Sequence, residues 1–262
     1  MALRTWTRTR LGGRPARWMA ALNARHPWSH NDHFHPWVIA SLPDRRRRAV
    51  EVGCGHGELA ATLAAYVDEV VALDRDATMR EVAAARCAGL PQVTVTDSSL
   101  ADLEGPVDVV TMVAVLHHLD VGATLREVRR LLAPGGRLLV VGLAPPASLA
   151  DHVWDVACIV SNPVIGWVKH PWPARGTSPL PPVPIAEPRQ TVADLRTVLD
   201  RELPGAVLRR REGFRITIEW TQPEPGGPDA ALPSLRVGRP VTSQDVADML
   251  DEESHQNHQE IP

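Results

Sequence analysis

The sequence predicts an α/β fold built on a mostly parallel β-sheet. Between residues 49 and 143, short apolar stretches of strand length alternate with amphipathic stretches of helix length. The first of these strands, residues 49–52, runs into three glycines at alternate positions, and a helical pattern starts directly after them. Strand, tight turn and helix are the opening of a βαβ unit, so the rest of the chain is arranged around this point.

The turn has the sequence E-V-G-C-G-H-G at residues 51–57. Its glycines let the backbone pass close to a ligand, and the N–H groups at the start of the next helix suit a carboxylate or phosphate. A dinucleotide fingerprint requires a further glycine where this chain has Glu58, which disfavours NAD(P) and FAD. A purely structural glycine turn is the alternative.

Composition narrows the class of protein. The 262 residues, 44% of them hydrophobic, can supply a core, and a net charge of −3 from 28 basic and 31 acidic residues argues against nucleic acid or an anionic membrane as partner. Cys54, Cys87 and Cys158 show no paired spacing, which favours a reduced, cytoplasmic setting. Neither a signal peptide nor an apolar stretch near the ~20 residues of a membrane span is evident.

Residues 1–48 are expected to form short helices, around 15–24 and 32–42. Asn31 or Asp32 would cap the second helix, with Trp37, Ile39 and Leu42 facing inward. Histidines cluster just before and inside it, at positions 30, 33 and 35. A metal site is disfavoured because neither a second ligand cluster nor a cysteine partner follows, so we expect no metal.

The next strands end in polar residues. Asp74 closes the strand at 69–73, and its two carboxylate oxygens could accept from the two hydroxyls of a ribose. Asp76 is the candidate cap of the helix at 77–87, in which Met79 is either a core residue or a contact to a ligand. Asp97 and Ser98 follow the third strand, 92–96; an Asx-turn would also explain Asp97. The fourth strand, 108–113, leads to His117 and His118.

Five elements, in this order and at this spacing, resemble class I S-adenosylmethionine (SAM) methyltransferases. They are the glycine turn, the acidic end of the second strand, Asp97, L-H-H-L at 116–119 and L-A-P-G-G at 132–136. The resemblance covers residues 49–143 and is to the ubiquinone/menaquinone-biosynthesis type and to actinobacterial natural-product enzymes. It implies a Rossmann-like sheet of seven strands, mostly parallel, with the last strand antiparallel.

The same resemblance divides the chain into a helical N-terminal lid (1–48), a SAM-binding core (49–143), a substrate-cover insertion after the fifth strand (144–189), the last strands of the sheet (190–222) and a tail (223–262). The lid would close over the amino-acid end of the cofactor through its N-D-H-F-H segment. SAM would bind with its ribose at Asp74 and its adenine at Asp97. After methyl transfer it would be released as S-adenosylhomocysteine (SAH). The implied cofactor-binding residues are Glu51, Gly53, Cys54, Gly55, Gly57, Asp74, Arg75, Met79, Asp97, Ser98 and Val113.

Methyl transfer from a sulfonium is an in-line displacement, which requires positioning and exclusion of water more than a dedicated catalytic cluster. If the acceptor must lose a proton, a histidine is a suitable base. His117 or His118 is the first candidate, the other being structural, and His33 and His35 on the lid compete for the role.

The eight tryptophans all lie outside residues 49–143. An aromatic pocket formed by Phe34, Trp154, Trp167 and Trp172 would suit a small, flat acceptor, although tryptophans also fill gaps under long covers. We therefore expect methylation of a small aromatic metabolite at carbon, oxygen or nitrogen, in bacterial specialised metabolism, with a homodimer left open. The alternatives are a non-catalytic SAM-binding protein and a macromolecule methyltransferase; the acidic net charge and the lack of an N-P-P-Y-type motif disfavour the second.

Overall fold

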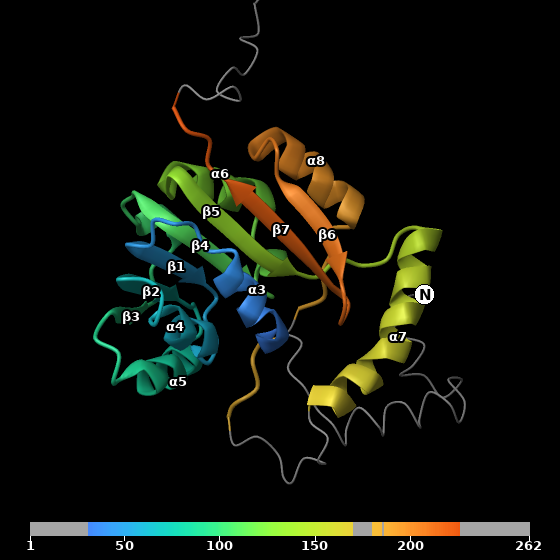
Figure 1. Ribbon diagram of the computed structural model, residues 1–262, viewed down its shortest axis with the longest axis horizontal. Coiled ribbons are helices and arrows are strands. Elements are labelled where there is room, and N and C mark those ends of the chain that lie inside the picture. Colours follow the sequence, from blue (N-terminus) through green and yellow to red (C-terminus); the bar gives the residue numbers. More distant parts are fainter. Residues whose placement is uncertain (1–30, 170–179, 185, 226–262) are drawn as a thin grey trace, which may run out of the picture. The chain divides into compact units, whose positions relative to one another are not determined.

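The computed structural model describes residues 31–169, 180–184 and 186–225 (Figure 1). The helix expected around residues 15–24, Trp172 and most of the tail lie outside these residues.

A seven-stranded sheet forms the centre of the fold, in the order β3-β2-β1-β4-β5-β7-β6. Neighbouring strands from β3 to β5 are parallel, and β7 pairs antiparallel with both β5 and β6. The predicted mostly parallel sheet with an antiparallel last strand is therefore confirmed. The strands are β1 Arg48–Val52, β2 Glu69–Leu73, β3 Val93–Thr96, β4 Val107–Val113, β5 Leu132–Gly142, β6 Val207–Arg211 and β7 Arg215–Thr221.

Helices pack on both faces of the sheet because alternate strand residues point to opposite sides. Val50 and Val110 belong to one apolar cluster, with residues of α6 (Val121–Leu131) and α8 (Val192–Glu202). Ala49 and Val109 belong to a second cluster, with residues of α3 (His35–Ala40), α4 (Glu58–Leu63) and α5 (Ala77–Cys87). Strands β1 to β3 are added toward one edge of the sheet, whereas β4 lies on the other side of β1. The carboxyl ends of β1 and β4 therefore form the switch point at which α/β proteins bind ligands.

Local capping follows the sequence where the partner is close in the chain. Asp76 accepts from the N–H groups of Thr78 and Met79 and starts α5, as expected. Thr191 and Asp194 form a capping box at the start of α8. Leu132 is the first residue of β5 and is buried in the same apolar cluster as residues of α6.

The N-terminal segment begins with a 3-10 turn, η1 (Asp32–Phe34), followed by α3. The prediction that Asn31 or Asp32 caps it is wrong: Asn31 stands at the cap position, but its side-chain oxygen accepts from the Arg215 guanidinium instead, at 2.9 Å. Phe34 is only 1% exposed and, like Val38 and Leu42, is part of the core. Apolar burial therefore anchors this segment to the core.

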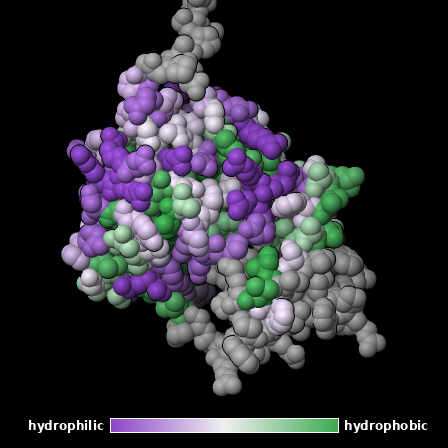
Figure 2. Space-filling model, viewed as in Figure 1, coloured by the Kyte–Doolittle hydropathy of each residue, from purple (hydrophilic) through white to green (hydrophobic). Residues whose placement is uncertain are grey.

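The long helix α7 (Leu149–Lys169) buries polar side chains and exposes apolar ones. Its buried side chains include Asp151, Asp155, Cys158 and Asn162, spaced at three and four residues along one face. Its exposed side chains are largely apolar, and Figure 2 shows hydrophobic residues at the surface beside it. The exposed apolar side chains of α7 are those of Leu149, Val153, Trp154, Val156, Trp167 and Val168. In the part of the chain that the structure describes, no helix has the length and hydrophobicity needed to cross a membrane.

Candidate functional site

The glycine turn lies between the end of β1 and the start of α4, at the switch point of the sheet. Gly53, Gly55 and Gly57 all have positive φ, between 53° and 77°. A Cβ on Gly53 would come within 2.5 Å of the Val115 side chain, and one on Gly57 within 3.0 Å of the Ala83 backbone. The backbone conformation therefore favours glycine at all three positions, and packing also requires it at Gly53 and Gly57.

Asp74 lies directly beside this turn. One of its carboxylate oxygens accepts from the Gly55 N–H and the other from the Asp76 N–H, each at 2.9 Å. Each oxygen has a second lone pair, so the carboxylate retains the capacity to accept from a ribose diol. The next residue, Arg75, is exposed.

Glu51 is the most perturbed carboxyl group of the site. It is 3% exposed, and its Oε2 has no hydrogen-bond partner among the residues described. Burial, then the charges of Glu58 and Asp74, raise the pKa of Glu51 to about 8, against the opposing effect of a hydrogen bond from the Ala60 backbone. A buried carboxyl with a free acceptor suits a cationic ligand, and SAM carries both an ammonium and a sulfonium group. The residues present therefore fit the cofactor that the resemblance implies.

The other predicted cofactor-binding residues differ in their exposure to solvent and in their contacts. The Asp97 side chain is 74% exposed and lies 3.8 Å from the Arg80 guanidinium. The Ser98 hydroxyl is 3.0 Å from that of Thr96, at the end of β3. Cys54 and Met79 are buried, and burial raises the pKa of the Cys54 thiol. Met79 is 2% exposed, and Val113 is partly buried at the end of β4.

The two adjacent histidines have different environments. They lie in the 3-10 turn η3 (Leu116–His118), with His118 exposed and His117 partly buried. Burial and the neighbouring His118 lower the pKa of His117 to about 4, against a hydrogen bond with the Ala186 backbone that raises it, while Arg215 adds to the lowering. Nδ1 of His117 has no hydrogen-bond partner within the described part of the chain. We therefore assign the Ala186 bond to Nε2, which makes Nδ1 a free acceptor in the neutral ring.

A cavity of about 10 Å³ adjoins His117. Its wall is mostly apolar and includes Leu116, Leu143, Pro188, Gln190 and Leu195. This volume has room for about one water molecule.

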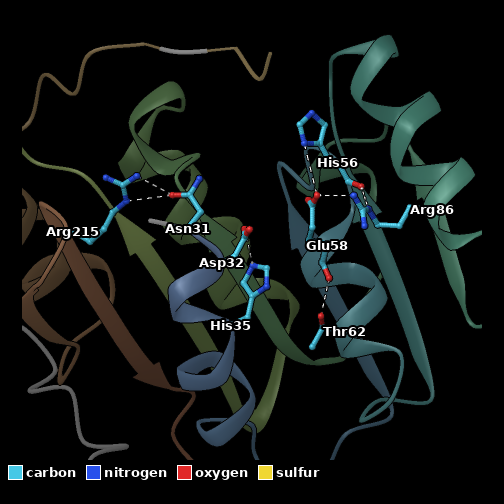
Figure 3. Close-up of polar contacts among 8 residues, drawn as sticks. All are labelled: Asn31, Asp32, His35, His56, Glu58, Thr62, Arg86 and Arg215. Carbon is cyan, nitrogen blue, oxygen red and sulfur yellow. Dashed lines mark hydrogen bonds and ion pairs between the residues drawn. The ribbon is translucent and has the colours of Figure 1, made fainter. Parts of the chain in front are cut away.

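His33 and His35, in the N-terminal segment, each lie close to a carboxylate. His33 Nε2 lies 2.8 Å from a carboxylate oxygen of Glu212, in the turn between β6 and β7. His35 Nε2 lies 3.8 Å from Asp32, and burial lowers the pKa of His35. Figure 3 shows Asn31, Asp32 and His35 on one side and His56 and Glu58 of the glycine turn on the other.

Three of the four residues of the predicted aromatic pocket lie within the described part of the chain, and their environments differ. Phe34 is a core residue, with the Arg211 guanidinium 5.6 Å from its ring centre. Trp154 is 40% exposed, its indole N–H donating to the Arg211 carbonyl, and Trp167 is 56% exposed. Trp220 belongs to the core of the sheet.

Sequence reasoning missed two polar residues of this region, His56 and Arg215. His56 occupies a position inside the glycine turn at which the motif allows any residue, and its Nε2 lies 2.8 Å from the Pro181 carbonyl oxygen. Arg215 binds Asn31 from 184 positions away in the chain. No local pattern indicates either contact.

Comparison with known proteins gives a consistent result. Residues 50–140 match the methyltransferase domain family. An uncharacterised methyltransferase of Mycobacterium tuberculosis is 34% identical over 204 residues, which cover 75% of this chain and 98% of that protein. A ubiquinone biosynthesis O-methyltransferase of a Caulobacter strain is 37% identical over 134 residues, 48% of this chain and 52% of that protein.

Among solved structures, a SAM-dependent methyltransferase from Aquifex aeolicus superimposes with a TM-score of 0.48 at 18% identity, over 72% of this chain and 89% of that chain. The family match, the mycobacterial relative of nearly full coverage and the strand order with its glycine turn all agree. The chain therefore belongs to the class I SAM-dependent methyltransferases, with SAM as its cofactor.

Proposed function

We propose that this enzyme methylates a small, largely apolar aromatic acceptor, such as a phenol, an indole or a quinone-like ring, at oxygen, nitrogen or carbon. The observation that carries the proposal is the wall beside His117. Leu116, Leu143 and Leu195 are apolar, whereas His117 and Gln190 supply the polar side chains. Binding sites for such ligands are apolar with a few placed polar groups.

His117 has two roles in this proposal. Its pKa of about 4 keeps the ring neutral at pH 7, so Nδ1 can accept a hydrogen bond from an acceptor O–H or N–H and orient its lone pair. The same low pKa makes it a weak base, and proton acceptance becomes more favourable if the ring gains contact with solvent. SAM supplies a methyl group on a positively charged sulfur, and closure of the site excludes competing water.

Two further observations support a small acceptor. The net charge of −3 does not favour nucleic acid as the acceptor. The Caulobacter relative is named as an O-methyltransferase of ubiquinone biosynthesis, although this chain spans only 52% of its length. We place the reaction in bacterial specialised metabolism on the sequence resemblance alone.

The test uses labelled SAM and a bacterial cell extract. We expect label in products that an organic solvent extracts, from a panel of phenols, indoles and quinols as well as from the extract. His117→Gln should reduce the transfer, and His118→Gln is the matched control at the exposed neighbour. Label that disappears after nuclease or protease treatment would show a macromolecular acceptor. SAM binding without any transfer would favour the non-catalytic alternative.

A further inference from the structure

A proline-rich segment contacts both the glycine turn and His117. We call residues 180–190 the strap; the structure describes 180–184 and 186–190. At one end, the Pro181 carbonyl oxygen lies 2.8 Å from Nε2 of His56 in the glycine turn. Val183 lies 3.8 Å from the point that a Cβ on Gly55 would occupy. Farther along, the Ala186 backbone bonds to His117, and Pro188 and Gln190 line the cavity beside it.

The strap is stiff by composition. It contains Pro181, Pro182, Pro184 and Pro188, and no described residue within it belongs to a helix or strand. Proline fixes φ near −65° and removes the backbone N–H, so proline-rich segments are extended and behave as semi-rigid spacers. We therefore expect a movement of the strap at Pro181 to displace Ala186, five residues away in the sequence.

We expect the strap to move when ligands bind. The cavity of about 10 Å³ beside His117 has no room for an aromatic ring. Val183, although 41% exposed, lies beside the glycine turn at which we expect the cofactor to bind. We therefore expect entry of the acceptor and exchange of the cofactor to displace the strap.

His56 is well placed to hold the strap down. Its Nδ1 lies 3.8 Å from Glu58, and Arg86 binds both the Glu58 carboxylate, at 2.7 Å, and the His56 carbonyl, at 2.8 Å (Figure 3). This brace orients the ring without touching Pro181 in the contacts described. A carbonyl can only accept, so Nε2 of His56 carries the proton and donates to it.

We propose that His56 is a positioning residue that latches the strap over the cofactor turn and His117 together, so that cofactor exchange and exposure of His117 to solvent occur in one opening movement. The part concerning His117 rests on the proposed function. The other titratable or charged groups near His117 are His118 and Arg215, and the strap's own Glu187 and Arg189 are exposed.

The first measurement is the dissociation rate of SAH, which requires no methyl acceptor. We expect His56→Ala to raise this rate about 3- to 10-fold, the range of one neutral hydrogen bond. His56→Gln keeps an N–H donor of similar reach and should stay within about twofold of the wild type. Arg86→Ala is the matched control because it loosens the turn without reaching the strap. Equal acceleration in Arg86→Ala and His56→Ala would assign the effect to the turn and overturn the latch.

The second measurement is the titration of His117 by NMR, with its signal assigned from His117→Gln. Burial is the main cause of its low pKa, so opening the strap should raise the midpoint in His56→Ala and leave it low in Arg86→Ala. An unchanged midpoint in His56→Ala would refute the coupled movement.

A third variant tests the stiffness and does not depend on the folding of His56→Ala. Pro182→Gly with Pro184→Gly changes two exposed positions between the latch and Ala186. It should raise the His117 midpoint while SAH dissociation stays within about twofold, because the latch is intact. A His117 midpoint that stays at the wild-type value would contradict a stiff strap. Failure of these tests leaves methyl transfer itself untouched, since that is judged by labelled product.

Discussion

Ionisation of Glu51 should make the stability of this protein fall as pH rises. Glu51 is fully buried at the end of β1, and its pKa is about 8 against an ordinary value of 4.5. Between these two values the folded chain binds a proton that the unfolded chain has released, so the free energy of unfolding decreases with pH. The contribution is therefore complete below pH 4.5 and is lost as pH rises through 8.

The size of the effect follows from the same two values. Each pH unit is worth about 1.4 kcal/mol, so the ionised carboxyl costs the native state on the order of 5 kcal/mol at pH 9. Glu51→Gln removes the charge while preserving the shape. We expect the variant to gain stability relative to the wild type by about this amount between pH 4.5 and pH 9, whatever constant offset the new amide introduces.

Urea unfolding followed by circular dichroism at pH 4.5, 7 and 9 measures this difference. Glu69→Gln is the matched control, because Glu69 starts the neighbouring strand with an exposed side chain. Identical pH slopes for wild type and Glu51→Gln would refute the reasoning. SAM should narrow the gap at high pH, because its positive charge favours the ionised carboxylate, and calorimetry should show proton release when SAM binds near pH 7.

Three further outcomes are expected. Asp74→Ala should weaken SAM binding by about 1–3 kcal/mol, through loss of a charged acceptor and of the bond to Gly55; unchanged affinity by calorimetry in a folded variant would remove the ribose assignment. Phe34→Ala should lower the free energy of unfolding by about 3–5 kcal/mol, and hydrogen exchange over residues 31–40 with and without SAM tests whether this anchored segment still orders on cofactor binding, as a lid would. Trp154→Leu and Trp167→Leu should leave the KM for an identified acceptor within about twofold if these exposed indoles lie outside its pocket; a large rise would restore the predicted stacking role.

Several features could be predicted because they depend on residues close together in the chain. Positive φ at Gly53, Gly55 and Gly57, the cap by Asp76 and the alternation of strands and helices are demands of the local backbone. Asp74 was found for the same reason, since it closes a strand parallel to the one that carries the glycine turn. The seven-stranded, mostly parallel sheet with an antiparallel last strand followed from the resemblance of these local motifs to a family.

The environments of side chains were decided only by the tertiary structure. The sequence pair at 117 and 118 does not distinguish a buried from an exposed histidine, because that depends on the distant Ala186 and Arg215. The tryptophan count suggested a pocket, yet Trp220 packs in the core and Trp154 lies on the outer face of a helix whose polar side is buried. Burial and long-range hydrogen bonds are set by elements far apart in the chain, so the sequence alone determined the glycine turn, whereas packing between elements determined the surroundings of His117.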